Sequence, residues 1–122
     1  MNILWICTDQ QRFDTLGCTG NEWVHTPNLD RLASEGVLFE NAYAQSPVCA
    51  PSRGSFLTGR YPRTCGPRQN GQDIDAKERL LPRILADNGY YCGLAGKLHL
   101  SACHDNTGRL MEPRIDRKST RL

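Results

Sequence analysis

A cysteine framed by prolines is the residue of this sequence best suited to nucleophilic chemistry. Cys49 has one proline two positions before it and another two positions after it. Each proline fixes its own φ and drives the preceding residue towards extended geometry, so we predict a stiff, non-helical turn at Cys49. A helix over 52–58, closed by Gly59, would follow directly and would place the thiol beside a helix N-terminus.

The predicted surroundings of this thiol favour an anion. Backbone N–H groups and the positive end of the helix dipole attract negative charge at a helix N-terminus. Arg53, four residues after Cys49, adds a planar cation whose N–H donors suit tetrahedral oxyanions such as sulfate or phosphate. The spacing therefore predicts a thiol next to an oxyanion-binding position.

The run that contains these two residues resembles the signature of the sulfatases. Residues 49–53 read C-A-P-S-R and are similar to the family motif C-x-P-S-R, and residues 55–62, S-F-L-T-G-R-Y-P, are similar to its continuation. In that family the cysteine is oxidised after synthesis to formylglycine, whose hydrated aldehyde is the nucleophile. The resemblance implies this conversion for Cys49, and it implies a formylglycine-generating maturase as a partner.

An aspartate follows the first apolar run. The run over 2–7 is apolar from Ile3 onward, which is typical of a strand buried on both faces of a parallel sheet. Asp9 lies just past the carboxyl end of that strand, where α/β folds place ligand chemistry. The opening resembles that of the sulfatases, so the resemblance implies that Asp9 and the residue made from Cys49 bind a divalent cation. Gln10 stands where a second Asp is commoner, and its amide oxygen can ligate a hard cation such as Ca²⁺ without charge. We expect Ca²⁺, with Mg²⁺ or Mn²⁺ as alternatives.

A lysine and a histidine two positions apart form the third part of the predicted site. If their segment is extended, Lys97 and His99 project from the same face, and two such groups suit a doubly charged oxyanion. Residues 96–99, G-K-L-H, resemble the sulfatase motif G-K-x-H, with Leu98 where a Trp is common. The resemblance implies that Lys97 and His99 act with Cys49 and Arg53 as catalytic residues.

The elements that must position these residues alternate along the chain. Helices are predicted between a cap at Thr26 and a stop at Gly36, and over 81–88. Besides the first strand, 37–44 and 90–95 are predicted as strands. The fold class is therefore α/β. The resemblance implies part of an alkaline-phosphatase-like sandwich, a mostly parallel sheet flanked by helices, truncated in this chain.

Residues 61–77 are rich in Gly, Pro and Arg and are predicted to form a long surface loop beside the site, where substrate selection could reside. Solvated loop positions are the alternative for each of its candidate contacts, which are Arg63, Arg68, Gln69 and Asn70. His25 is a candidate substrate contact or a helix-capping residue. His104 and Asp105 are candidate ligands or simply polar loop residues.

A length of 122 residues allows one domain at most. The resemblance extends from residue 2 to about residue 115, and a sulfatase catalytic domain is several times longer. We therefore expect residues 1–115 to be the N-terminal part of such a domain. Residues 116–122 have no apolar period and look like a non-native, artefactual tail, so they are excluded from the fold prediction.

Charge and cysteine usage narrow the classes of protein further. The net charge of +2 comes entirely from residues 116–122, and the rest lacks a basic stripe with interleaved aromatics, so we expect no nucleic-acid partner. No apolar run is long enough to span a bilayer, so no membrane partner is expected. The apolar run at the N-terminus has no basic lead, and the six cysteines form no C-x-x-C pair. These features predict free thiols and a cytoplasmic protein.

The expected function is that of a sulfuric ester hydrolase acting on a small sulfate ester or a sulfated saccharide. The resemblance leaves a phosphonate or phosphate monoester hydrolase of the same superfamily as the alternative, because such an enzyme can use a similar cysteine-derived nucleophile. From another class, the six cysteines and three histidines could bind zinc in a non-catalytic or truncated product. We expect the 122-residue chain alone to be inactive, because the family's remaining metal ligands come from later sequence.

Overall fold

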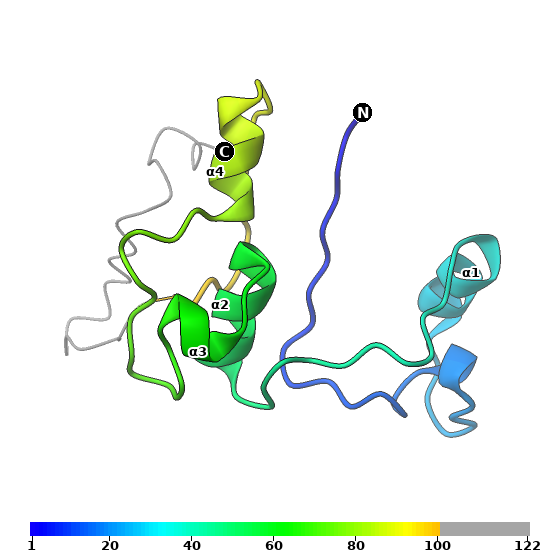
Figure 1. Cartoon of the computed structure of the whole chain (residues 1–122). Coiled ribbons are helices and arrows are strands. Elements are labelled where there is room, and N and C mark those ends of the chain that lie inside the picture. The colour runs from blue at the N-terminus through cyan, green and yellow to red at the C-terminus, as the bar shows by residue number, and fades with distance from the viewer. Residues whose placement is uncertain (101–122) are drawn as a thin grey trace. The chain divides into compact units, whose positions relative to one another are not determined.

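The computed structural model describes residues 1–100 of the 122-residue chain, and these residues belong to two compact units (Figure 1). The first unit is Met1–Tyr43, and the second begins at Ala44. The described elements, in chain order, are η1 (Gly17–Thr19), α1 (Pro27–Glu35), α2 (Cys49–Thr58), α3 (Pro62–Cys65) and α4 (Leu81–Asp87).

In the first unit, α1 packs beside the short 3-10 helix η1 (Figure 1). The predicted bounds of α1 are confirmed, since the helix begins directly after Thr26 and ends directly before Gly36. The Thr26 hydroxyl does not cap its own helix. It accepts a hydrogen bond from the Gly17 N–H at 2.8 Å and donates one to Asp30 at 3.0 Å. These bonds join η1 to the start of α1, although no residue among 1–43 is buried.

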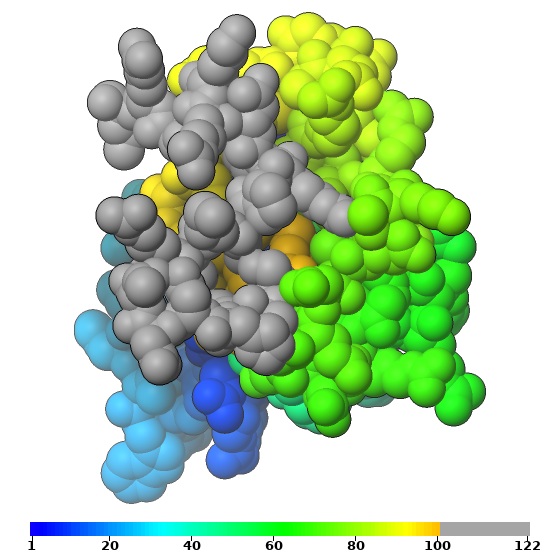
Figure 2. All heavy atoms as spheres, turned by 90° about the vertical axis from the view of Figure 1, so that its left-hand side faces the viewer, coloured from blue at the N-terminus to red at the C-terminus, as the bar shows by residue number. Residues whose placement is uncertain are grey.

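The second unit packs α2 against α3 and α4 around a small apolar core. The buried core side chains come from α2, from α3, from the residue before α4 and from the segments after α3 and α4, and are Leu57, Cys65, Leu80, Ile74 and Leu100. The Ile74 N–H donates to the Leu100 carbonyl at 3.1 Å, which fastens the end of the described chain to the segment after α3. In Figure 2 the orange residues near position 100 accordingly lie directly against the green segment.

The chain reverses direction directly after α3, at Gly66. Its φ of 119° lies in the region that favours glycine, and a Cβ there would meet the Asp73 carbonyl and the Asp75 nitrogen at 3.0 Å. The Cys65 carbonyl accepts a hydrogen bond from the same Asp75 nitrogen at 2.9 Å, so this backbone cannot move away freely.

Gly66→Ala is therefore expected to lower the free energy of unfolding by about 2–4 kcal/mol, from backbone strain and steric overlap together. Gly71→Ala is the matched control, because Gly71 also has a positive φ, 83°, but open space around it. We expect that control to cost about 1 kcal/mol. Urea unfolding of both variants measures the difference, and equal losses would show that the overlap at Gly66 is unimportant.

The three predicted strands, 2–7, 37–44 and 90–95, are not formed within residues 1–100. The first run is exposed throughout, with Leu4 at 84 % exposure, and a turn at 40–41 interrupts the second run. A strand exists only where a neighbouring strand accepts its backbone hydrogen bonds, and parallel neighbours require crossover connections. The described chain does not supply such neighbours to these apolar runs.

The start of α2 corrects another prediction. The helix begins at Cys49 and not at Ser52, so Cys49 lies in the first helical turn and the predicted non-helical turn is wrong. The extended residue is Val48, with φ −99° and ψ 138°. Pro51 is tolerated three residues into the helix because the first N–H groups of a helix have no intrahelical acceptor, so no bond is lost. The Ser52 N–H closes the first turn on the Val48 carbonyl at 3.1 Å.

The remaining helix predictions need smaller corrections. The helix predicted over 81–88 is α4, which ends one residue earlier, and Gly89 follows with φ 83°. The predicted surface loop 61–77 is wrong in part, because it contains α3 and buries Cys65 and Ile74 in the core. Among residues 1–100, no helix has both the length and the apolar character needed to cross a bilayer.

Candidate active site

Cys49 and Arg53 lie one turn apart on α2. Residues four apart share a face of a helix, so the thiol and the guanidinium belong to the same side of α2. Cys49 is half-buried, and Arg53 is buried at 7 % exposure. The cysteine and the arginine that were predicted to belong to one site therefore lie on the same helix.

Arg53 also reaches the segment that carries the predicted lysine and histidine. Its Nη1 donates to the Lys97 carbonyl at 2.6 Å. A hydrogen bond from a charged donor is stronger than one between neutral groups, so this contact ties the backbone of Lys97 to α2. The structure therefore brings the Lys97 backbone against Arg53, across 44 residues of sequence.

His99 does not follow the extended geometry predicted for residues 97–99. Its φ of 57° is left-handed, so the expectation that Lys97 and His99 share a face of an extended segment is not met. The Nδ1 atom of His99 is buried and has no hydrogen-bond partner among the described residues. A buried polar atom without a partner is costly, which is typical of groups whose partner is a ligand or a further part of a protein.

Asn70 contacts the cysteine directly. Its Oδ1 accepts hydrogen bonds from the Cys49 Sγ at 3.3 Å and from the Ala50 N–H at 3.0 Å. Of the four loop residues predicted as candidate contacts, Asn70 is thus placed at the start of α2. Arg63, Arg68 and Gln69 are exposed and remain predictions as substrate contacts.

The predicted metal ligands belong to different units of the described chain. Asp9 and Gln10 belong to the first unit and Cys49 to the second. Within residues 1–100, no group of three or more His, Cys, Asp and Glu side chains could hold a metal ion. Because Ca²⁺ takes six to eight oxygen ligands, Asp9 and Gln10 supply the right kind of donor but too few of them.

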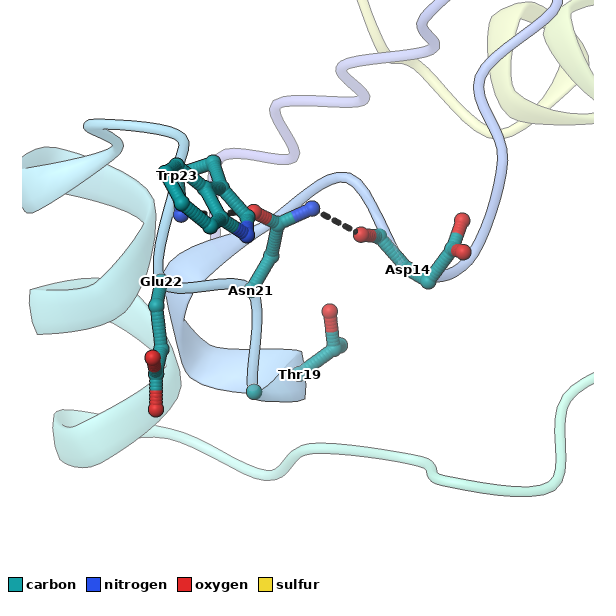
Figure 3. A pocket seen from close by; sticks show the side chains of 6 residues that line it. Asp14, Thr19, Asn21, Glu22 and Trp23 are labelled. Atoms are coloured by element: carbon teal, nitrogen blue, oxygen red, sulfur yellow. Dashed lines mark hydrogen bonds between the residues drawn. The ribbon is translucent and has the colours of Figure 1, made fainter.

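The first unit contains a shallow hollow of about 290 Å³ (Figure 3). The hollow is lined by Asp14, Thr19, Gly20, Asn21, Glu22 and Trp23. None of the predicted site residues lines it. The polar atoms of the Asn21 side chain hold the loop around the hollow together, since Nδ2 donates to the Asp14 carbonyl at 2.6 Å and Oδ1 accepts from the Trp23 N–H at 2.9 Å. His25 is exposed in the same unit and stays a prediction. His104 and Asp105 lie outside the described residues.

Comparison with known proteins identifies the family. The sulfatase family model matches residues 1–111. The chain is 44 % identical over 99 residues to an ulvan-active sulfatase of Formosa agariphila, covering 81 % of this chain and 19 % of that protein. It is 37 % identical over 118 residues to human steryl-sulfatase, covering 87 % and 20 %.

A solved structure is similar as well. The crystal structure of YidJ from Bacteroides fragilis, studied as a candidate sulfatase, aligns with a TM-score of 0.69 and 41 % identity over 77 % of this chain and 22 % of that one. This chain spans about a fifth of the length of the relatives that it matches. The agreement of the family match, the relatives and the solved structure shows that the chain belongs to the sulfatase family.

Proposed function

We propose that this sequence is the N-terminal part, residues 1–115, of a sulfuric ester hydrolase whose nucleophile is a formylglycine made from Cys49. The observation that carries the proposal is the arrangement on α2, where the cysteine lies one turn from a buried guanidinium in a chain of the sulfatase family. A nucleophile beside a fixed cation is what the attack on an anionic ester requires.

The catalytic residues proposed on this chain each have a part in this reaction. Arg53 binds the oxygens of the sulfate group, and its bond to the Lys97 carbonyl holds the guanidinium in one orientation. Lys97 and His99 neutralise further charge on the transferred group, and the buried Nδ1 of His99 is a free acceptor or donor for that purpose. Formylglycine supplies a hydrated-aldehyde hydroxyl as the nucleophile toward sulfur.

The cation site of the complete protein is proposed to include Asp9, Gln10 and the residue made from Cys49. The hard oxygen atoms of an aspartate and an amide suit Ca²⁺, or Mg²⁺ and Mn²⁺ as alternatives. The other ligands are proposed to come from sequence beyond the described residues, since residues 1–100 form no group of three or more His, Cys, Asp and Glu side chains that could hold a metal ion.

The sheet is also a proposal for the complete domain. The apolar run at the N-terminus leaves Leu4 84 % and Ile6 72 % exposed, which is unusual for side chains of this type. We propose that 2–7, 37–44 and 90–95 become strands of a mostly parallel, alkaline-phosphatase-like sheet when further strands lie beside them. The similarity to a solved structure at a TM-score of 0.69 supports this proposal.

The substrate is proposed to be a sulfated saccharide or a smaller sulfate ester. The relatives are named for both classes, since one acts on ulvan and another is a steryl-sulfatase. The phosphonate or phosphate ester alternative differs only in the oxyanion that Arg53 would bind. The zinc alternative has no support within residues 1–100, where no group of three or more His, Cys, Asp and Glu side chains could hold a metal ion.

Sulfate release tests the proposal. The complete protein that contains this sequence, co-produced with a formylglycine-generating maturase, is expected to hydrolyse a chromogenic aryl sulfate. The Cys49 peptide should carry an aldehyde in place of its thiol by mass spectrometry. The 122-residue chain, produced in the same way, is the control and should show no turnover. Faster hydrolysis of a phosphonate ester than of the sulfate ester would favour the alternative, and an unmodified, active Cys49 would refute the proposed nucleophile.

A further inference from the structure

The N-terminus of α2 is capped by a residue from outside its own sequence. The Ala50 N–H is among the first N–H groups of the helix, which have no intrahelical acceptor. The residue in the N-cap position is Val48, whose side chain has no oxygen to offer. The Oδ1 of Asn70, twenty residues further on, accepts this N–H at 3.0 Å. Because an N–H donor must face an oxygen, this bond also fixes which way the carboxamide points.

The same oxygen atom receives the thiol. Cys49 Sγ lies 3.3 Å from Asn70 Oδ1, so one carboxamide oxygen accepts both the thiol hydrogen and the adjacent backbone N–H. Asn70 Oδ1 therefore fixes the Cys49 side chain and the backbone of the first turn of α2 relative to each other. A half-buried cysteine without such an acceptor would be free to adopt other staggered rotamers.

Asn70 can do this because its loop is fastened to α2. Pro67 is fully buried, and a Cβ at Gly54 would lie 3.2 Å from its Cγ, so the absence of a side chain at Gly54 allows the close approach. The Arg68 N–H donates to Gln72 Oε1 at 2.7 Å and closes the loop on itself. The loop that carries the Asn70 carboxamide is therefore held in place by its own contacts and by its packing on α2.

We propose that Asn70 is a positioning residue for Cys49. Asn70 holds the thiol in one orientation at the start of α2 before Cys49 is modified, and it holds the modified side chain in the same place afterwards. The catalytic consequence rests on the proposed function. The orientation of the thiol does not, so the two can be tested separately.

Thiol alkylation provides the first test. We would measure the rate at which iodoacetamide modifies Cys49 at a fixed pH near 8, by peptide mass, in the complete protein produced without the maturase. Asn70→Ala is expected to raise this rate about threefold or more, because it removes the acceptor that holds the Sγ and frees the half-buried side chain to adopt rotamers open to the reagent. Asn70→Asp is expected to leave the rate within about twofold of the parent value, because its carboxylate keeps an oxygen that can accept from the Ala50 N–H at the same place.

A raised rate in Asn70→Ala together with an unchanged rate in Asn70→Asp excludes a merely structural role. General loosening of the loop would expose Cys49 and raise the rate in both variants, which would overturn the proposal, as would unchanged rates in both. Asn88→Ala is the matched control. Asn88 is another exposed asparagine bound to a helix end, since its Nδ2 donates to the Ile84 carbonyl of α4 at 2.8 Å, and its removal should leave the Cys49 rate unchanged.

Steady-state kinetics of the matured protein provide the second test. Asn70→Ala should lower kcat about tenfold or more with little change in KM, because orientation of the nucleophile matters in the transition state and not in substrate binding. A rise in KM at constant kcat would make Asn70 a substrate contact and overturn the positioning role. If the parent protein releases no sulfate, the proposed function fails, while the alkylation rates still decide the role of Asn70.

Discussion

Cys49→Ala is expected to reduce sulfate-ester hydrolysis by the matured complete protein at least about 10³-fold, because the proposed reaction has no covalent route without this side chain. Because Cys49 is half-buried on the first turn of α2, we expect alanine there to change the free energy of unfolding little, so the loss would be one of chemistry. The measurement is kcat/KM for a chromogenic aryl sulfate, together with the thermal unfolding midpoint of both proteins.

Cys92→Ala is the matched control for this substitution. Cys92 is also a half-buried free thiol of the second unit, and its Sγ donates to the Pro82 carbonyl at 3.4 Å. We expect kcat/KM of the Cys92→Ala protein to stay within about twofold of the parent value, since substitutions of half-exposed residues away from the site rarely affect more than their own contacts. A Cys49→Ala protein that retained more than a tenth of the activity would remove the basis of the proposed function.

Arg53→Lys is expected to lower kcat/KM about 10²-fold, although the charge is retained. A lysine ammonium is a point charge and cannot present the planar fork that a guanidinium offers to sulfate oxygens. It would also be too short to keep the 2.6 Å bond to the Lys97 carbonyl, so the segment that carries Lys97 and His99 would lose its tie to α2. Arg53→Ala should cost about 10³-fold in kcat/KM and about 2–3 kcal/mol in the free energy of unfolding.

Arg83→Lys serves as the control for the arginine. Arg83 is exposed on α4 and forms an ordinary surface pair with Asp87, Nε to Oδ1 at 3.1 Å, which contributes well under about 1 kcal/mol. Its replacement should change neither kcat/KM nor stability measurably. Activity of Arg53→Lys equal to that of the parent would show that Arg53 is a structural residue of α2 and not a ligand of the sulfate group.

The helices were predictable because their signals are local. For α1, a threonine at the cap, a proline at the first position and a glycine after the last turn lie within eleven residues, and the helix has the bounds that they indicate. The end of α2 at Gly59, with φ 69°, follows from the same kind of signal. The start of α2 differs from the prediction because a proline such as Pro51 disfavours a helix only beyond its first turn, where the backbone N–H groups need an intrahelical acceptor.

The strands could not be verified from the sequence because they depend on distant partners. An apolar run such as 2–7 predicts burial, but backbone pairing requires a neighbouring strand that residues 1–100 do not provide. The loop over 61–77 shows the opposite error. Its composition predicted a solvated surface, yet Ile74 reaches the core at 5 % exposure, because a single apolar residue in a polar stretch gives no periodic signal.

Residue types and their spacing along the chain predict the candidate site: a cysteine and an arginine four residues apart, with a lysine and a histidine further on. Those positions depend on residue type and on helical spacing, which are local properties. The folded chain alone shows that Asn70 contacts Cys49, that Arg53 donates to the Lys97 carbonyl, and that His99 has a left-handed backbone and a buried nitrogen. These contacts span about twenty to forty-four residues of sequence, and they form because loops and segments pack on α2, which no local pattern encodes.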